Sequence, residues 1–230
     1  MIQNENRYPA WMFLCGVLQR KHGIPFTEAT LDEIRAQFGF MEQHYGEERR
    51  GYHNMDHIAS CLKELSHFAR LGQATHTPED STILAVEFAL WKHDVIYDPT
   101  KNDNEARSAD IAYTDALNLG FGAKFAKRVQ RLVMATVHKP GLTEFDEQLI
   151  ADVDISGMGY SWNSFKENGI GIRREYAHVP DKDFNEGRAR ILELFAEREH
   201  IYYLPYFRDR YQARARANLL QAVEEYRSVA

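Results

Sequence analysis

Cysteine and long apolar runs are both scarce in this chain of 230 residues. It has only two cysteines, Cys15 and Cys61, which argues against the disulfide framework of small secreted domains. No apolar run approaches the roughly 20 residues that a membrane-spanning helix needs, and the mean hydropathy is −0.53. The stretch Trp11–Val17 follows acidic and polar residues and lacks the basic start of a secretory signal. We therefore expect a protein without membrane segments that works in the reducing cytoplasm.

An excess of positive charge is also missing. Lys and Arg number 28 against 34 Asp and Glu, which gives a net charge of −6 and argues against non-specific binding to nucleic-acid polymers. Linkers rich in Ser and Gly, repeats, low-complexity tracts and alternating strand patterns are likewise scarce. Hydrophobic residues make up 44% of the chain, enough for a sizeable core. We predict a single folded domain over residues 1–230.

What is present is helical periodicity. One apolar set steps by four, three and four residues: Ile58, Leu62, Leu65 and Ala69. The segment Ile83–Ile96 carries two apolar stripes, as expected of a helix at the centre of a domain, and Thr77 or Asp80 can cap its start. Breaks occur at Gly23–Pro25, Asp98–Thr100, Lys139–Gly141 and Val179–Asp181. The pattern predicts an all-α bundle of about nine to eleven helices.

The last amphipathic helix bears on the oligomeric state. Its apolar face includes Tyr211, and its predicted outer face carries Arg210, Arg214 and Arg216. Such a face can remain in solvent or pack on a second copy, so we expect either a monomer or a homodimer.

Three patches hold side chains that can bind a metal ion. His53 and His57 are four residues apart and would share one face of a helix. His93 and Asp94 lie near the end of the buried helix, where a charged carboxylate is costly unless a cation or another partner compensates it. The third patch, residues 150–156, contains Asp152 and Asp154.

The donor types narrow the choice of metal. Two imidazoles with two carboxylates predict one divalent ion among Mn, Fe, Co, Ni, Mg and Zn. A mixed nitrogen and oxygen set with open water positions suits the first five better than a closed structural zinc site.

The order His57 … His93-Asp94 … Asp154 resembles the HD superfamily of metal-dependent phosphohydrolases, whose fold is all-helical. A bacterial subgroup of predicted HD phosphohydrolases is more similar still, over nearly the whole chain. The shared stretches are YHNMDHI, ALWKHDVIYDPTKNDNEARSA, DVDISGMG and REYAHVPDKDF. The resemblance implies that His57, His93, Asp94 and Asp154 are the metal ligands, with Asp152 competing for the last position.

The resemblance also implies hydrolysis of a nucleotide or another small phosphoester. The triplet Tyr52-His53-Asn54 is similar to the start of the cyclic-nucleotide phosphodiesterase signature, which implies that His53 is the proton donor. The second acidic and histidine signature of those enzymes is missing after His93-Asp94, which argues against a cyclic nucleotide.

Further polar residues are candidates by their position alone. Asp98 and Glu105 follow the HD pair and can orient the attacking water. The same loop offers contacts to phosphate or ribose through Lys101, Asn102 and Asn104. A second basic cluster can bind phosphate through Arg173, Arg174, Lys182 and Arg188.

Two other functions stay open. Some HD-fold proteins hold two irons and activate O₂, using two more histidines between the HD pair and the last Asp. Only His138 lies in that interval here. The third possibility is a non-catalytic module that binds a nucleotide. Cys61, four residues after His57, can approach the metal or serve as a small core residue.

Overall fold

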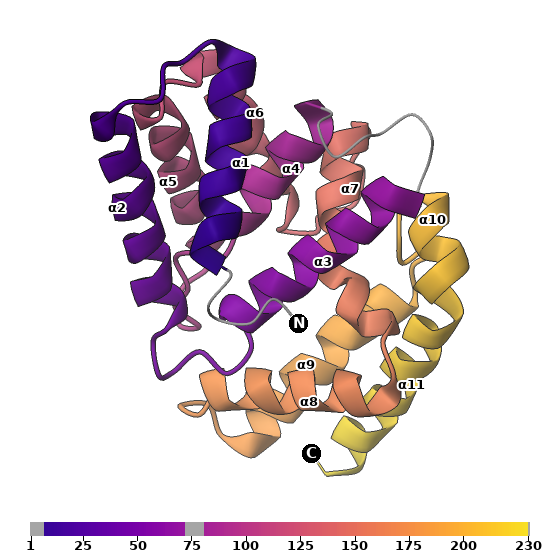
Figure 1. Ribbon diagram of the computed structural model, residues 1–230. Coiled ribbons are helices and arrows are strands. Elements are labelled where there is room, and N and C mark those ends of the chain that lie inside the picture. Colours follow the sequence, from indigo (N-terminus) through magenta and orange to yellow (C-terminus); the bar gives the residue numbers. More distant parts are fainter. Residues whose placement is uncertain (1–6, 72–80, 230) are drawn as a thin grey trace. The chain divides into compact units, whose positions relative to one another are not determined.

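The computed structural model describes residues 7–71 and 81–229 (Figure 1). These ranges contain helices and no strand, which confirms the all-α prediction and its estimate of nine to eleven helices. The candidate caps Thr77 and Asp80 lie outside the described residues. No helix in the described ranges combines the length and the apolar character needed to cross a bilayer.

The described residues form a series of helices. In chain order they are α1 (Arg7–His22), α2 (Glu28–Tyr45), α3 (Met55–Leu71), α4 (Ser81–Lys92), α5 (Asn104–Asn118), α6 (Gly122–Ala135), α7 (Phe145–Asp154), the 3-10 helix η2 (Ile155–Gly159), α8 (Trp162–Glu175), α9 (Asp181–Ala196), α10 (Pro205–Phe207), the π-helical turn η3 (Arg208–Gln212) and α11 (Ala213–Ser228).

The chain contacts divide these elements into two compact units. The first unit takes in residues up to Glu47 together with His53–Ile150, and the second takes in Glu48–Tyr52 together with Ala151–Ala230. The chain therefore passes between the units after Glu47, after Tyr52 and after Ile150. The single domain expected over residues 1–230 stays a prediction.

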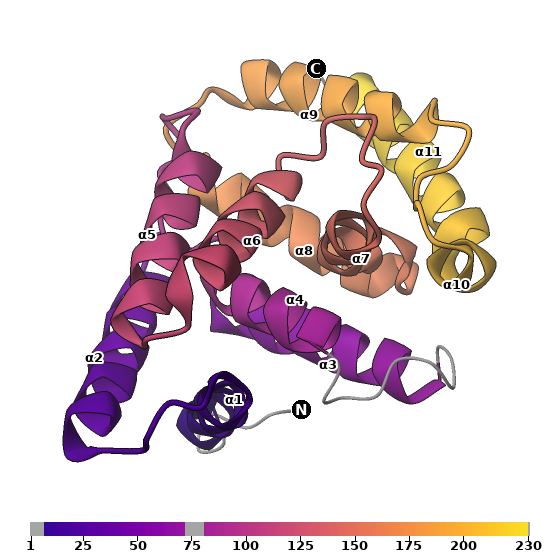
Figure 2. The same ribbon diagram turned by 90° about the horizontal axis from the view of Figure 1, so that it is seen from above.

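Helix α4 is the centre of the first unit. It packs against α1, α3, α5 and α6 (Figure 2). Three residues of one predicted stripe, Leu84, Phe88 and Trp91, lie in α4 and are buried, and the fourth, Val95, is buried beyond the end of the helix at Lys92. Trp11 of α1 lies with its ring centroid 5.2 Å from that of Phe88 and 5.8 Å from that of Trp91. The two-sided apolar pattern therefore identified the central helix correctly.

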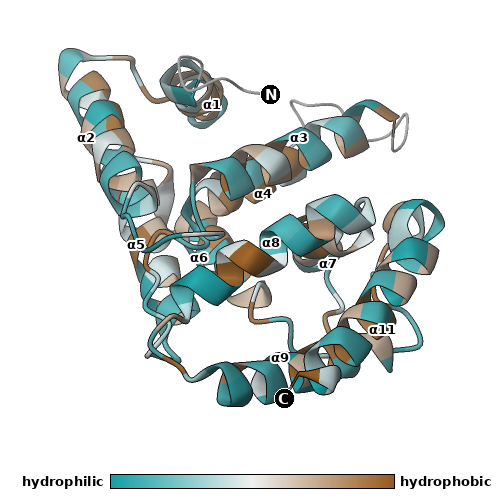
Figure 3. Ribbon diagram, turned by 90° about the horizontal axis from the view of Figure 1, so that it is seen from below, coloured by the Kyte–Doolittle hydropathy of each residue, from teal (hydrophilic) through white to brown (hydrophobic). Residues whose placement is uncertain are grey.

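The helices of the second unit have mixed surfaces, and hydrophilic and hydrophobic segments follow one another along α8, α9 and α11 (Figure 3). Of the three arginines predicted on the outer face of the last helix, Arg210 and Arg214 are exposed and Arg216 is partly buried. Arg214 donates a 2.6 Å hydrogen bond to the Gly159 carbonyl. Arg216 donates to the carbonyl oxygen of Ala196, the last residue of α9, and to those of Arg198 and Glu199 just after the helix. These bonds form because the last carbonyls of a helix have no partner within it.

The segment Glu48–Tyr52 is held against α8 within the second unit. A Cβ atom added to Gly171 would lie 2.5 Å from the Gly51 carbonyl oxygen, so the two backbones meet where only glycine fits. The Tyr52 amide donates to Oε1 of Glu175, 2.8 Å away, and Glu175 is buried. The backbone is thus fixed up to the residue before His53.

We expect Gly171→Ala to destabilise the protein by about 1–3 kcal/mol, because the new methyl group overpacks this contact. Gly169→Ala in the same helix is the matched control, since its Cβ would meet only the Tyr226 hydroxyl at 3.4 Å. The control should be neutral or more stable, by up to about 1 kcal/mol from helix propensity. Urea unfolding of both variants checks this, and equal stabilities would contradict it.

The acid Glu87 on α4 gives a pH-dependent prediction. Burial raises the pKa of Glu87 from 4.5 to about 7. The folded state thus holds this proton more tightly than the unfolded state does. The contribution of Glu87 to the free energy of unfolding therefore falls as the pH rises from 4.5 to 7, by up to about 3 kcal/mol. Glu87→Gln should therefore be more stable than the wild type at pH 8, with this advantage lost at pH 5. Denaturant unfolding at the two pH values measures the difference, and a pH-independent difference would refute it. Glu42→Gln, at an exposed position of α2, serves as the control.

Candidate metal centre

The first candidate ligand stands at the start of α3. The Asn54 side-chain oxygen accepts hydrogen bonds from the amides of Asp56, at 2.9 Å, and His57, at 3.3 Å. Asn54 thus caps the helix, as its side-chain chemistry favours, and α3 begins at Met55. The prediction that His53 and His57 share a helix face is therefore wrong, because His53 precedes the helix.

His53 nevertheless lies near His57. Their ring centroids are 6.2 Å apart. The His53 ring stacks on Tyr97, with centroids 4.1 Å apart and planes inclined by 27°. Sequence reasoning gave no role to Tyr97, although it stands four residues after His93 and within the shared stretch ALWKHDVIYDPTKNDNEARSA.

The second and third candidates follow α4 directly. The helix ends at Lys92, and His93 and Asp94 occupy the turn after it. Nδ1 of His93 lies 2.9 Å from the Leu90 carbonyl oxygen. A carbonyl oxygen can only accept, so Nδ1 carries a proton. When the ring is neutral, the lone pair is then on Nε2. This orientation is typical of a metal-binding histidine.

Three electron-pair donors converge from these segments. Nε2 of His57 lies 3.2 Å from Nε2 of His93. Oδ2 of Asp94 lies 3.0 Å from Nε2 of His93 and 3.6 Å from Nε2 of His57. Both histidines are buried, and the Asp94 side chain is 15% exposed. Lone pairs so close repel one another unless a proton or a cation lies between them.

The spacing fits a divalent metal. Metal bonds to histidine nitrogen and carboxylate oxygen are about 2.0–2.2 Å long, so two ligands at right angles lie about 3 Å apart. The three observed separations are this short or slightly longer. The residues His57, His93 and Asp94 therefore form a buried group that can hold a metal ion.

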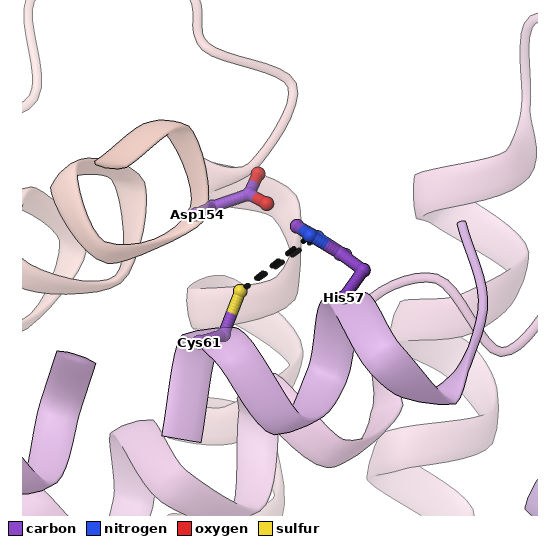
Figure 4. A group of neighbouring side chains, drawn as sticks. All are labelled: His57, Cys61 and Asp154. Atoms are coloured by element: carbon purple, nitrogen blue, oxygen red, sulfur yellow. Dashed lines mark hydrogen bonds between the residues drawn. The ribbon is translucent and has the colours of Figure 1, made fainter. Parts of the chain in front are cut away.

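The residue Cys61 lies against His57, one turn further along α3 (Figure 4). Its Sγ atom is 3.7 Å from Nε2 and 3.8 Å from Nδ1 of that histidine. Cys61 is buried. Its thiol therefore packs beside the imidazole from within the same helix.

The two aspartates at the end of α7 differ in their surroundings. Asp152 is 0% exposed, and its carboxylate accepts from the amides of Tyr203, at 2.8 Å, and Leu204, at 2.7 Å. Burial raises its pKa to about 7, although these two amides and Arg208 lower it. Both Asp152 oxygens thus hold the backbone after α9 in place, whereas Asp154, drawn in Figure 4, ends α7 and is half-buried. Its role as the last ligand stays a prediction.

The loop after the HD pair is closed by its own polar residues. Oδ1 of Asp98 accepts from the amide and the hydroxyl of Thr100, at 2.9 and 2.7 Å. The Asp98 amide donates to Oδ1 of Asn104, and Nδ2 of Asn104 donates to the Asp98 carbonyl, both at 2.9 Å. Asp98 and Asn104 therefore shape the loop. Glu105 stands in the first turn of α5 and is partly exposed.

The remaining candidates are placed as follows. Lys101 and Asn102 are exposed. In the second unit, Arg173 binds Asp181 and the carbonyls of Tyr176 and Val179, so its guanidinium clamps the α8–α9 connection. This engagement argues against the predicted phosphate contact, which the charge pattern alone had suggested. Arg174 and Lys182 are exposed, while Arg188 and His138 are partly buried.

Comparison of the chain with models of protein families, with curated proteins and with solved structures finds no match. The donor geometry is therefore the observation from which a function can be argued.

The contrast between the two aspartates can be measured. Asp152→Asn leaves one carbonyl oxygen for two amides, so we expect a loss of about 1–3 kcal/mol in unfolding free energy. Metal affinity should not change. The measurements are thermal unfolding and titration with Co²⁺. If Asp152→Asn instead keeps its stability and loses metal affinity, Asp152 rather than Asp154 is the ligand.

Proposed function

We propose that this protein is a metal-dependent phosphohydrolase of the HD type that acts on a nucleotide or another small phosphoester. The observation that supports the proposal is the convergence of His57, His93 and Asp94, with donor atoms 3.0–3.6 Å apart. The motif resemblance adds the reaction class. In this proposal the protein is cytoplasmic and needs one divalent ion.

The proposal assigns the metal ligands as His57, His93, Asp94 and Asp154. Three of the four are argued from contacts within the first unit, and Asp154 is added from the sequence pattern. A divalent cation, when bound, polarises a phosphoryl oxygen and makes water more acidic. The chain's own residues then have to orient the substrate and move the protons.

His53 is the proposed general acid. Its ring is held by the Tyr97 stack and lies near the ring of His57. In its protonated form it would transfer a proton to the leaving oxygen as the bond from phosphorus to that oxygen breaks. The stack fixes the plane of the ring, so the proton is delivered along one direction.

Glu105 is the proposed acceptor of the proton that the attacking water loses. It stands in the first turn of α5, after the loop closed by Asp98 and Asn104. Asp98 would thus act by shaping the loop rather than on the water itself. Lys101 and Asn102 are exposed in the same loop, where they can contact phosphate oxygens. The products are an alcohol and a phosphate.

The test combines metal analysis with hydrolysis of nucleotides and of an aryl phosphate, in the presence of Mn²⁺, Co²⁺, Ni²⁺ or Mg²⁺. We expect His93→Ala, Asp94→Ala and Asp154→Asn to lose metal affinity and activity together. His53→Ala should retain the metal and lower kcat by about 10²–10⁴-fold, the contribution of a general acid. Hydrolysis that survives His93→Ala at the wild-type rate would exclude the proposed mechanism.

The same experiment separates the alternatives. Two tightly bound irons per chain would favour the oxygenase. Tight nucleotide binding without turnover under every metal would favour the binding module. Glu167→Gln, an exposed position of α8, controls for effects of charge loss alone.

A further inference from the structure

The last residue of α4 is a lysine with no exposed surface. Lys92 is 0% exposed, although lysine is among the residues least often fully buried. Its Nζ atom lies 2.6 Å from Oδ2 of Asp115 on α5. The same ammonium lies 4.7 Å from the centroid of the Trp11 ring on α1. One buried charge therefore joins three helices of the first unit.

Stability alone is a weak reason for such a pair. The desolvation of two charges offsets much of their attraction, and apolar side chains of similar volume are often as stabilising. An ion pair differs from an apolar contact in fixing direction, because the ammonium must point at the carboxylate. Asp115 is itself held, since its carbonyl oxygen accepts from Nε2 of Gln37 at 3.1 Å.

The direction matters because His93 is the next residue in the chain. Where α4 ends sets where the His93 ring and the Asp94 carboxylate point. The neighbouring backbone is anchored as well. The Tyr45 hydroxyl donates to the Trp91 carbonyl at 3.1 Å, and the Ser108 hydroxyl accepts from the Ile96 amide at 3.0 Å. Of these anchors, Lys92 is the charged one and adjoins a candidate ligand.

We propose that the Lys92–Asp115 ion pair positions His93 and Asp94 for metal binding, so that Lys92 is a positioning residue of the metal centre. The inference rests on the proposed function, because it presumes that these residues bind a metal.

Lys92 and Asp115 differ in what their replacement leaves behind in the structure. The Asp115 side chain is 15% exposed and lines a groove of about 400 Å³ between α2 and α5, together with Glu33, Gln37, Phe40, Asp110 and Thr114. Without Lys92, the Asp115 carboxylate can therefore be hydrated from the groove. Without Asp115, the ammonium would stay buried and lose its carboxylate. Lys92→Met, which keeps the volume and the contact with Trp11, is thus the informative variant.

The probe is Co²⁺, titrated into the metal-free full chain and followed by its visible absorption. Lys92→Met should bind Co²⁺ at least about tenfold more weakly than the wild type, as is typical when a residue that supports a ligand is removed. Its absorption spectrum should also change, because the two ligands lose their fixed direction. Thermal unfolding without metal reports the structural effect separately.

Arg128→Met is the matched control. Arg128 pairs with the buried Asp146 at 2.8 Å and donates to Thr82, near the opposite end of α4. This variant also removes a cation from a partly buried pair in the first unit. It should lose stability while keeping the wild-type affinity and spectrum for Co²⁺.

A folded Lys92→Met with an affinity within twofold of the wild type and the same spectrum would overturn the inference. If Lys92→Met does not fold, Asp115→Asn takes its place, with a smaller loss of affinity expected and an unchanged affinity counting against the inference. A wild-type chain that binds no Co²⁺ would instead refute the proposed function, and the positioning role with it.

Discussion

Mutual repulsion among three electron pairs is the constraint on which the candidate centre depends. Two imidazole nitrogens and a carboxylate oxygen lie 3.0–3.6 Å from one another, with both rings buried. A fold retains such an arrangement only if a proton or a cation lies among the three. The cost of crowding these donors without a proton or a cation between them is the physical reason why the cluster can hold a metal ion.

Much of the polar sequence around the HD pair builds the support for this cluster. The segment from Trp91 to Asp98 is held by contacts from α2 and α5, through Tyr45, Asp115 and Ser108. The two aspartates of α7 differ in the same way, because both carboxylate oxygens of Asp152 accept hydrogen bonds from backbone amides. Side chains that look alike in the sequence therefore divide into a few candidate ligands and many residues that keep the backbone in place.

The sequence predicted what depends on short-range periodicity. The stripes of α3 and α4, the helix breaks and the all-α class follow from spacing that each helix carries within itself. The proximity of His57 to His93 was expected from the motif order. The features that the sequence did not predict are hydrogen bonds and ion pairs between residues far apart in the chain. Nothing local marks Arg216 as binding the end of α9, or Lys92 as buried against Asp115. The four-residue spacing of His53 and His57 predicts one helix for both. The cap formed by Asn54 instead starts the helix after His53, and the spacing alone does not reveal this.

The five residues Glu48–Tyr52 limit how recombination can exchange parts of this chain. They belong to the second unit, yet the first unit precedes them and follows them in the sequence. Neither unit is therefore a continuous stretch of gene, and one recombination crossover cannot exchange a whole unit for another. A crossover near residue 150 would leave Gly51 facing an unrelated surface in place of Gly171. The two halves are consequently expected to diverge together, as one evolutionary module.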